Sequence, residues 1–369
     1  MTGRKRLFYM VSALTLFMGS LTLFAGCGGE LNGVTAPAAD DGQTQGAGII
    51  SGSAVKGPIN GGTVTAYAVT NGTMGAELAS GTTDSQGNYH ISIGDYSGPL
   101  MLQVSGGTYT DEATGATVTM APGDVMTVVM ASVSSDATTS AIQITPLTSM
   151  AQAMAGNMAG GMTDANIAAA NAAISNHFQV SDIIHTRPMN PLTEGAGAGA
   201  TQDMKNYGMA LAAMSQYAKD SGMASPSGVV TLMMNDALDG VLDGMKGNTP
   251  IGMNGSGGGA AGSGGTETML STAGTSSLAT SMEQFMGSGM NKSGVDNSEM
   301  QLLMNNLASS DGQLMGNGGM MNGGTGGDMM SWGTGTSDMI TGETDTGGMM
   351  NGGAGGGMMM GGSEMGGIR

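Results

Sequence analysis

Glycine sets the strongest limit on what this chain can fold into, because it supplies 69 of the 369 residues and is spread unevenly. A glycine has more backbone freedom to lose on folding than any other residue. Only 13 residues are aromatic, so large side chains that could anchor a core are scarce. Hydrophobic patterning runs from about residue 48 to residue 247, and the chain beyond is a low-complexity mixture of Gly, Met, Ser and Asn. We therefore expect two folded domains and a mostly disordered tail over residues 248–369.

The N-terminus is typical of a bacterial export signal. Basic residues at positions 4–6 precede an uncharged, largely apolar run over residues 7–26, and the only cysteine, Cys27, follows directly. This segment resembles a lipoprotein signal peptide, in which small residues such as Ala25 and Gly26 admit a peptidase and the cysteine sulfur takes a diacylglyceryl group. An ordinary cleaved signal peptide and an uncleaved membrane anchor are the alternatives, since twenty residues can just span a bilayer.

The resemblance implies that residues 1–26 are removed and that Cys27 is lipidated. Each buried lipid methylene contributes about 0.8 kcal/mol, and stable anchoring needs more than one chain, a demand that a triacylated cysteine meets. Gly28 and Gly29 follow the cysteine with no Asp directly after it, which by the same resemblance favours the outer membrane. Residues 27–47 are rich in Gly, Ala, Asp and Pro and predict a flexible tether.

Charge excludes one class of partner. The chain after the signal holds seven Lys and Arg against all 28 Asp and Glu, a net charge of −21. Such a chain repels phosphate backbones, so we expect no nucleic-acid binding. With Cys27 lipidated no internal disulfide can form, so the exported domains depend on their hydrophobic cores alone.

Residues 48–134 carry the pattern of short strands separated by turns. Residues 63–69 alternate and are rich in β-branched side chains, and they stop at Asn71-Gly72, a strong hairpin signal. Further strands are predicted at residues 89–93, 100–104 and 125–133. This spacing indicates an antiparallel β-sandwich.

Two short motifs in this region support a family resemblance. Residues 57–64 read Gly-Pro-Ile-Asn-Gly-Gly-Thr-Val, and residues 83–89 read Thr-Asp-Ser-Gln-Gly-Asn-Tyr. Both resemble the carboxypeptidase regulatory-like, or prealbumin-like, domain of bacterial surface proteins. The resemblance implies a β-sandwich used for spacing or binding. The family name does not imply peptidase activity, and no zinc-ligand pattern occurs in the sequence.

Helical periodicity over residues 140–247 predicts a small helical bundle. Thr145 can cap its first helix, with Pro146 at the first position, and Thr163 or Asp164 begins the second. Two more helices are predicted, one with an apolar stripe over residues 204–218 and one that opens at residues 225–226.

Within the low-complexity region, two short helices are predicted at residues 275–287 and 298–309. The first has apolar residues on one face, and the second begins with Ser298 and Gln301 at the spacing of a capping box. We expect no order from residue 312 onward.

Methionine gives the tail its one specific chemical capability. Twelve methionines lie between residues 315 and 365, and the heptapeptide Gly-Gly-Met-Met-Asn-Gly-Gly occurs at 318–324 and again at 347–353. Thioether sulfur is a soft ligand suited to Cu(I) or Ag(I). The candidate ligands are Met320, Met321, Met329, Met330, Met349 and Met350. There are three alternatives to a metal site. Met and Gly expanded together with no selected ligand geometry, or the tail is an adaptable binding surface, or its methionines consume oxidants by forming sulfoxides.

No catalytic or cofactor-binding constellation is recognisable elsewhere. The three histidines, His90, His177 and His185, lack cysteine partners for an ordinary zinc site. No recognisable motif supplies a serine or cysteine nucleophile with its base.

Two acidic segments are most simply interpreted as solvated surface. Asp236, Asp239 and Asp243 lack the spacing of an EF-hand loop and are predicted to share one exposed helix face. Residues 109–115 are predicted to form an exposed hairpin loop.

These observations predict a multidomain α+β lipoprotein: an antiparallel β-sandwich, a small helical bundle and a disordered Met/Gly-rich tail. We expect it to be non-enzymatic, without a resident cofactor, and to bind or scaffold at the cell envelope. Its expected partners are the outer membrane, through the lipid on Cys27, and an envelope protein or surface ligand, on either the periplasmic or the outer face. The alternative is a lipoprotein that sequesters Cu(I) or Ag(I) through its tail.

Overall fold

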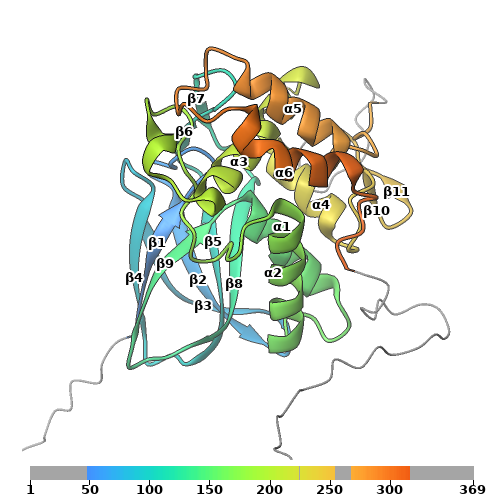
Figure 1. Cartoon of the computed structure of the whole chain (residues 1–369). Coiled ribbons are helices and arrows are strands. Elements are labelled where there is room, and N and C mark those ends of the chain that lie inside the picture. The colour runs from blue at the N-terminus through green and yellow to red at the C-terminus, as the bar shows by residue number, and fades with distance from the viewer. Residues whose placement is uncertain (1–47, 224, 254–266, 316–369) are drawn as a thin grey trace, which may run out of the picture.

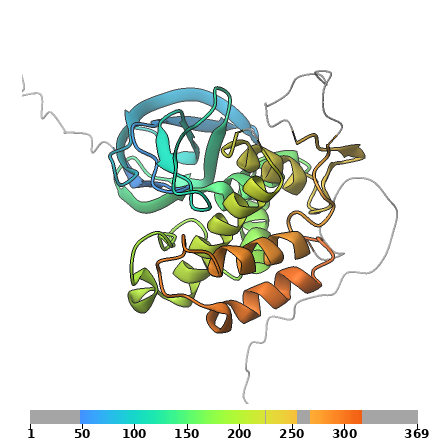
Figure 2. The same ribbon diagram turned by 90° about the horizontal axis from the view of Figure 1, so that it is seen from above.

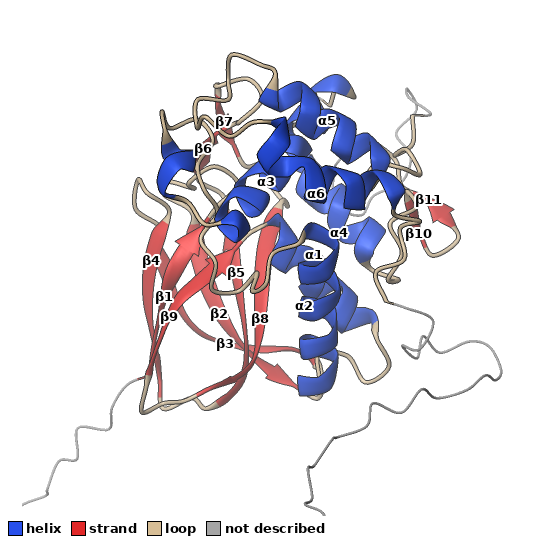
Figure 3. Cartoon of the chain, in the orientation of Figure 1, coloured by secondary structure: helices blue, strands red, loops and turns tan. Residues whose placement is uncertain are grey.

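Nine strands come first in the described chain and the helices follow them, as the computed structural model in Figure 1 shows for residues 48–223, 225–253 and 267–315. Within these residues, antiparallel sheets and six α-helices confirm the predicted α+β class. Figure 3 shows β1 to β5, β8 and β9 gathered on one side and the helices on the other, with the short strands β10 and β11 beside the helices.

Two sheets build the β part. One contains three strands in the order β4-β1-β9, and the other four in the order β3-β2-β5-β8. Their bounds are β1 Gly48–Ala54, β2 Thr63–Thr70, β3 Thr73–Thr82, β4 Asn88–Gly94, β5 Gly98–Ser105, β8 Val125–Val133 and β9 Thr138–Ile144. Alternate residues point inward, as Tyr89, Ile91 and Ile93 of β4 do, so the period-2 pattern places one face of each strand in the core.

Strand β9 corrects two predictions. It pairs with β1 in parallel, so this part is not purely antiparallel, and its residues 140–144 were predicted to belong to the helical domain. Ile142 and Ile144 are fully buried, and Gly52 of β1 lies so close to the Ile142 carbonyl that a Cβ atom would be 1.8 Å from that oxygen. A pairing between residues about 90 positions apart leaves no local sequence signal, which explains why the boundary at residue 134 was too early.

Two small hairpins complete the β content of the described chain. Strands β6 (Thr108–Thr110) and β7 (Thr117–Thr119) enclose residues 111–116, and β10 (Met245–Lys246) pairs with β11 (Thr249–Pro250).

The first two helices begin where their caps predict. Helix α1 (Pro146–Asn157) starts after Thr145, whose hydroxyl accepts from the N–H of Thr148, and α2 (Asp164–Phe178) is capped by Thr163. Both caps satisfy backbone donors that the first turn of a helix leaves free.

Helix α3 is the centre of the helical part. It spans Gln202–Asp220, its residues 206–218 are all buried, and it contacts both α4 (Gly228–Ala237) and α5 (Ser276–Met286). A single 3₁₀ turn, η1 (Ala196–Gly199), lies in the loop between α2 and α3.

Helices α5 and α6 (Asn297–Ser309) pack onto α3 and onto each other, although their sequence is of low complexity. Leu278, Met282 and Phe285 of α5 are buried, which is enough apolar surface to hold the helix in place. The capping box of α6 consists of Asp296 and Glu299 rather than the predicted Ser298 and Gln301, because the helix begins two residues earlier.

One hydrophobic core runs through both parts of the fold. Helix α1 lies against β8, where the Ser149 hydroxyl accepts from the N–H of Thr127 at 2.8 Å. Seen from above, the strands enclose a rounded layer and the helices stack along one side of it (Figure 2). We call the boundary between the sheets and the helices the seam, and loops of both parts meet there.

Candidate functional site

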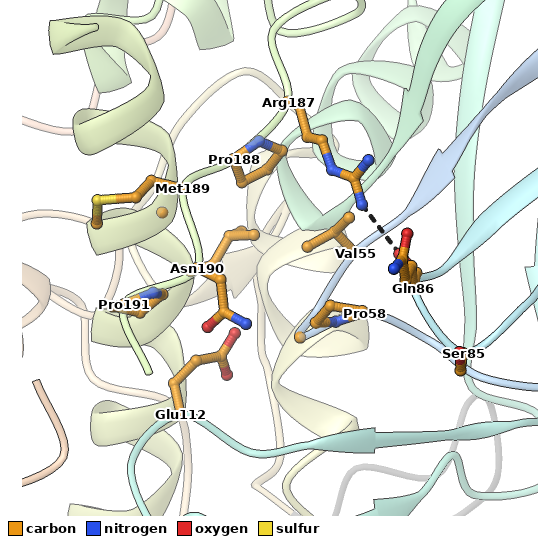
Figure 4. Close-up of a pocket in the computed structure, with 13 residues that line it drawn as sticks. Val55, Pro58, Ser85, Gln86, Glu112, Arg187, Pro188, Met189, Asn190 and Pro191 are labelled. Atoms are coloured by element: carbon orange, nitrogen blue, oxygen red, sulfur yellow. Dashed lines mark hydrogen bonds between the residues drawn. The ribbon is translucent and has the colours of Figure 1, made fainter. Parts of the chain in front are cut away.

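A cavity of about 210 Å³ lies at the seam between the sheets and the helices. Figure 4 shows it between the loop at residues 187–191 and the turns of the β part. Five separate segments line it: Val55 with Gly57 and Pro58, residues 85–86, Glu112, residues 187–191, and Gly208 with Leu211 of α3. Pockets form preferentially where two structural units meet, so this is the first place to look for a ligand.

The wall formed by residues 187–191 is held rigidly. Pro188 and Pro191 fix two of its five backbone φ angles. The N–H of Met189 donates to the Met204 carbonyl at 3.0 Å, and Gly208 lies so close that a Cβ there would be 2.1 Å from the Met189 oxygen. Any side chain at position 208 would push this loop into the cavity, so glycine sets the width of the site.

Arg187 carries the positive charge of the cavity mouth. Its guanidinium donates to the Asn88 side-chain oxygen at 3.1 Å and to the Gln86 carbonyl at 3.0 Å, the second of which is the dashed line in Figure 4. Among the described residues, no carboxylate lies within ion-pair distance of it. Two bonds leave three of the five guanidinium N–H donors for a ligand.

Behind the opposite wall lies a buried ion pair. Lys56 Nζ donates to Glu112 Oε2 at 2.8 Å, and the Ser215 hydroxyl donates to the same oxygen at 2.6 Å. The three residues are between 1% and 2% exposed. Lys56 also bonds to Ser215, and its ammonium lies 5.7 Å from the centre of the Tyr109 ring. Burial chiefly, and then the charge of Glu112, raise the pKa of the Tyr109 hydroxyl.

This cluster has the composition of a serine–lysine nucleophile pair but not its chemistry. In such a pair the lysine accepts the proton of the serine, whereas here both Lys56 and the Ser215 hydroxyl donate to Glu112 Oε2. Ser215 and Lys56 are also closed off from solvent and are not among the residues that line the cavity. The cluster therefore fixes the position of Glu112, whose side chain does line the cavity.

Glu112 and its neighbours correct the prediction of an exposed loop at residues 109–115. Asp111, Glu112 and Ala113 are all buried, because this loop folds under α3. The Asp111 carboxylate accepts from the N–H and hydroxyl of Thr114, which closes the turn.

Asp236 is likewise buried and not part of a solvated helix face. Its Oδ1 accepts from the N–H groups of Asp243 and Gly244 at 3.0 and 2.6 Å, and its Oδ2 has no partner among the residues that the structure describes. Burial, reinforced by the charges of Asp243 and Asp239, raises the pKa of Asp236 to about 7.

The predicted ligands of the tail and the predicted lipid site lie outside the described residues. These are Cys27, Met320, Met321, Met329, Met330, Met349 and Met350. In the described ranges, no group of three or more His, Cys, Asp or Glu residues is arranged to hold a metal ion.

The three histidines stay apart. His177 is buried, with Nε2 2.9 Å from the Gly274 carbonyl, and burial lowers its pKa. His185 pairs with Asp182 at the surface, and His90 is exposed on β4.

None of the helices that the structure describes combines the length and apolar character needed to cross a bilayer.

The sequence pattern did not identify the cavity, although both motifs behind the family resemblance reach it. Gly57 and Pro58 come from the first motif, and Ser85 and Gln86 come from the second. The run Arg-Pro-Met-Asn-Pro at residues 187–191 was the remaining signal, since two prolines beside an arginine favour a stiff, charged loop.

Comparison with known proteins adds little. No protein-family model and no curated protein matches the chain. Among solved structures, a 9R-lipoxygenase from Cyanothece PCC8801 is similar at 14% identity and a TM-score of 0.18. That match covers 30% of this chain and 18% of the lipoxygenase chain. This chain thus spans less than a fifth of that enzyme, and so weak a likeness carries no argument about activity.

Proposed function

We propose that this chain is a non-enzymatic ligand-binding protein of the bacterial cell envelope, tethered through a lipid on Cys27. In this proposal the two sheets form a prealbumin-like β-sandwich, α1 to α6 form the helical bundle, and the Met/Gly-rich tail is disordered. The N-terminal basic and apolar segments and the single cysteine support the tether.

The seam cavity is the observation that carries the binding function. It is lined by both resemblance motifs and by the helical part, so neither part alone would form it. Its walls combine proline and aliphatic surface with a few polar groups, the composition typical of small-ligand sites. The rigid loop at residues 187–191 means that the site is formed before the ligand arrives, which lowers the cost of binding.

A fragment screen by ligand-observed NMR on the full mature chain tests this function. The screen uses small amines, carboxylates, amides and sugars, and we expect several hits that compete for one site. Gln86→Trp places a large ring at the cavity mouth, on an exposed turn, and should abolish these hits. Gln284→Trp makes the same change on the exposed face of α5 and should leave them intact. Hits that survive Gln86→Trp, or no hits at all, would refute the seam as a binding site.

A second candidate function rests on the repeated heptapeptide at residues 318–324 and 347–353. Its paired methionines favour sequestration of Cu(I) or Ag(I) by the tail.

A further inference from the structure

We infer that the ligand of the seam cavity is a small zwitterion, an amino acid or a dipeptide, held by its ammonium at Glu112 and by its carboxylate at Arg187. This inference rests on the proposed binding function and names the chemistry of the site. It follows from the size of the cavity, from the unequal depth of its two charged residues, and from their remaining hydrogen-bonding capacity.

Size excludes large ligands. A volume of about 210 Å³ lies below the roughly 300–1,000 Å³ usual for pockets that take drug-sized molecules. Gly208 and the loop it supports prevent the cavity from widening on that side, because a close backbone contact joins them. The ligand must therefore have about the size of one or two amino-acid residues.

The inner end of the cavity offers an acceptor. Lys56 and Ser215 both bond to Oε2 of Glu112, and no described residue donates to its Oε1. Glu112 is one of the residues that line the cavity, so in this proposal Oε1 is the atom that meets the ligand. A carboxylate oxygen in this position accepts most strongly from a charged donor, which is what an ammonium group supplies.

The mouth offers a donor. Arg187 is exposed, whereas Glu112 is almost completely buried, so the positive residue lies at the opening and the negative one lies inside. Free guanidinium N–H groups match a carboxylate in geometry and charge. Figure 4 shows the side-chain amides of Asn190 and Gln86 in the lining of the same cavity, where the peptide group of a bound dipeptide would contact them.

Charge balance supports a zwitterion over a simple anion or cation. Lys56 and Glu112 neutralise each other, and Arg187 is close enough to Asp84 to lower the pKa of that carboxyl group, after larger contributions from Asn88 and Gln86. The surroundings of the cavity are thus close to neutral. A ligand without net charge enters without leaving a buried charge uncompensated.

Calorimetry on the full mature chain tests the inference with L-Ala-L-Ala as the probe. We expect one molecule to bind per chain. N-acetyl-L-Ala-L-Ala, which lacks the ammonium, and L-Ala-L-Ala amide, which lacks the carboxylate, should each bind at least about tenfold more weakly, as expected for the loss of one hydrogen bond to a charged group. A blocked dipeptide that binds as tightly as the free one would overturn the inference.

Variants assign the two ends of the ligand. Arg187→Gln should weaken L-Ala-L-Ala but leave the binding of its amide unchanged, because that probe has no carboxylate to lose. Lys246→Gln removes an exposed cation far along the chain and controls for long-range charge. Glu112→Gln should weaken the free dipeptide and not the acetylated one, with thermal melting used to verify that the variant is folded. If the fragment screen finds seam ligands but L-Ala-L-Ala does not bind, this inference fails and the proposed function stands; if nothing binds at the seam, both fail.

Discussion

Asp236 should make the stability of this protein fall as the pH rises. Its side chain is 0% exposed at the end of α4, and one of its two oxygens has no partner in the described chain. Desolvation is the main reason that its pKa is about 7 in the folded state, against 3.8 for an ordinary aspartate. Between these two values the folded protein holds a proton that the unfolded chain releases, so protonation favours folding.

The magnitude follows from proton linkage. The penalty is absent below about pH 4, grows as the pH rises from 3.8 to about 7, and stays constant above. At about 1.36 kcal/mol per pH unit, the shift is worth roughly 4 kcal/mol of unfolding free energy. That is a large share of the roughly 5–15 kcal/mol by which a typical domain is stable.

Asp236→Asn isolates this effect. The amide oxygen can still accept from the N–H groups of Asp243 and Gly244, but the side chain no longer ionises. Its NH₂ group lies at the position of the unpartnered oxygen, which costs about 1–3 kcal/mol at every pH. The variant is therefore recognised by its pH dependence and not by its absolute stability.

Urea denaturation between pH 4.5 and 8 measures the difference. We expect the unfolding free energy of the wild type to fall relative to Asp236→Asn across this range and to level off near pH 7.5. Asp95→Asn, on an exposed turn, is the matched control and should follow the wild type at every pH. Parallel pH profiles for the wild type and Asp236→Asn would refute the argument that a buried carboxyl group retains its proton here.

Three further predictions test other parts of the molecule. Lys56→Met should destabilise the fold by about 3–5 kcal/mol in urea denaturation, because it removes the ion-pair partner of the buried Glu112 carboxylate. Combining Lys56→Met with Glu112→Leu should regain most of that loss, and equal losses for the single and double variants would contradict this prediction. Cys27→Ser should abolish incorporation of labelled palmitate and release the protein from the membrane fraction; an unlipidated wild-type N-terminus would count against the tether. Under anaerobic conditions the full mature chain should compete with a weak chelator for Cu(I) about equally at pH 5 and 7 and should ignore Zn(II), since thioethers do not titrate. Replacing Met320, Met321, Met349 and Met350 by leucine should abolish that competition. Unchanged competition would contradict ligation by sulfur.

Local patterns were enough to predict several elements. The strand predicted at residues 125–133 coincides with β8, and the helix caps at Thr145 and Thr163 lie where their hydroxyl groups predict them. These features depend on side-chain periodicity and on hydrogen bonds within one turn, so the segment carries its own information.

The partners of buried polar residues could not be predicted in this way. Glu112 looks like a loop residue in the sequence, yet it is buried because Lys56, 56 positions earlier, and Ser215, 103 positions later, bond to its carboxylate. Asp236 has the spacing of a solvated helix face and is enclosed because the chain after α4 turns back and donates to it.

The low-complexity sequence, the hydrophobic patterning and the single cysteine are properties of the chain itself, and from them alone we predicted a signal, two patterned regions and a tail. The tertiary structure alone decided the parallel pairing of β9 with β1, the packing of α5 and α6 onto α3, and the cavity built from five separate segments. The physical reason is that burial and pairing between distant residues are settled by the whole core, whose contacts leave no periodicity in the sequence around either partner.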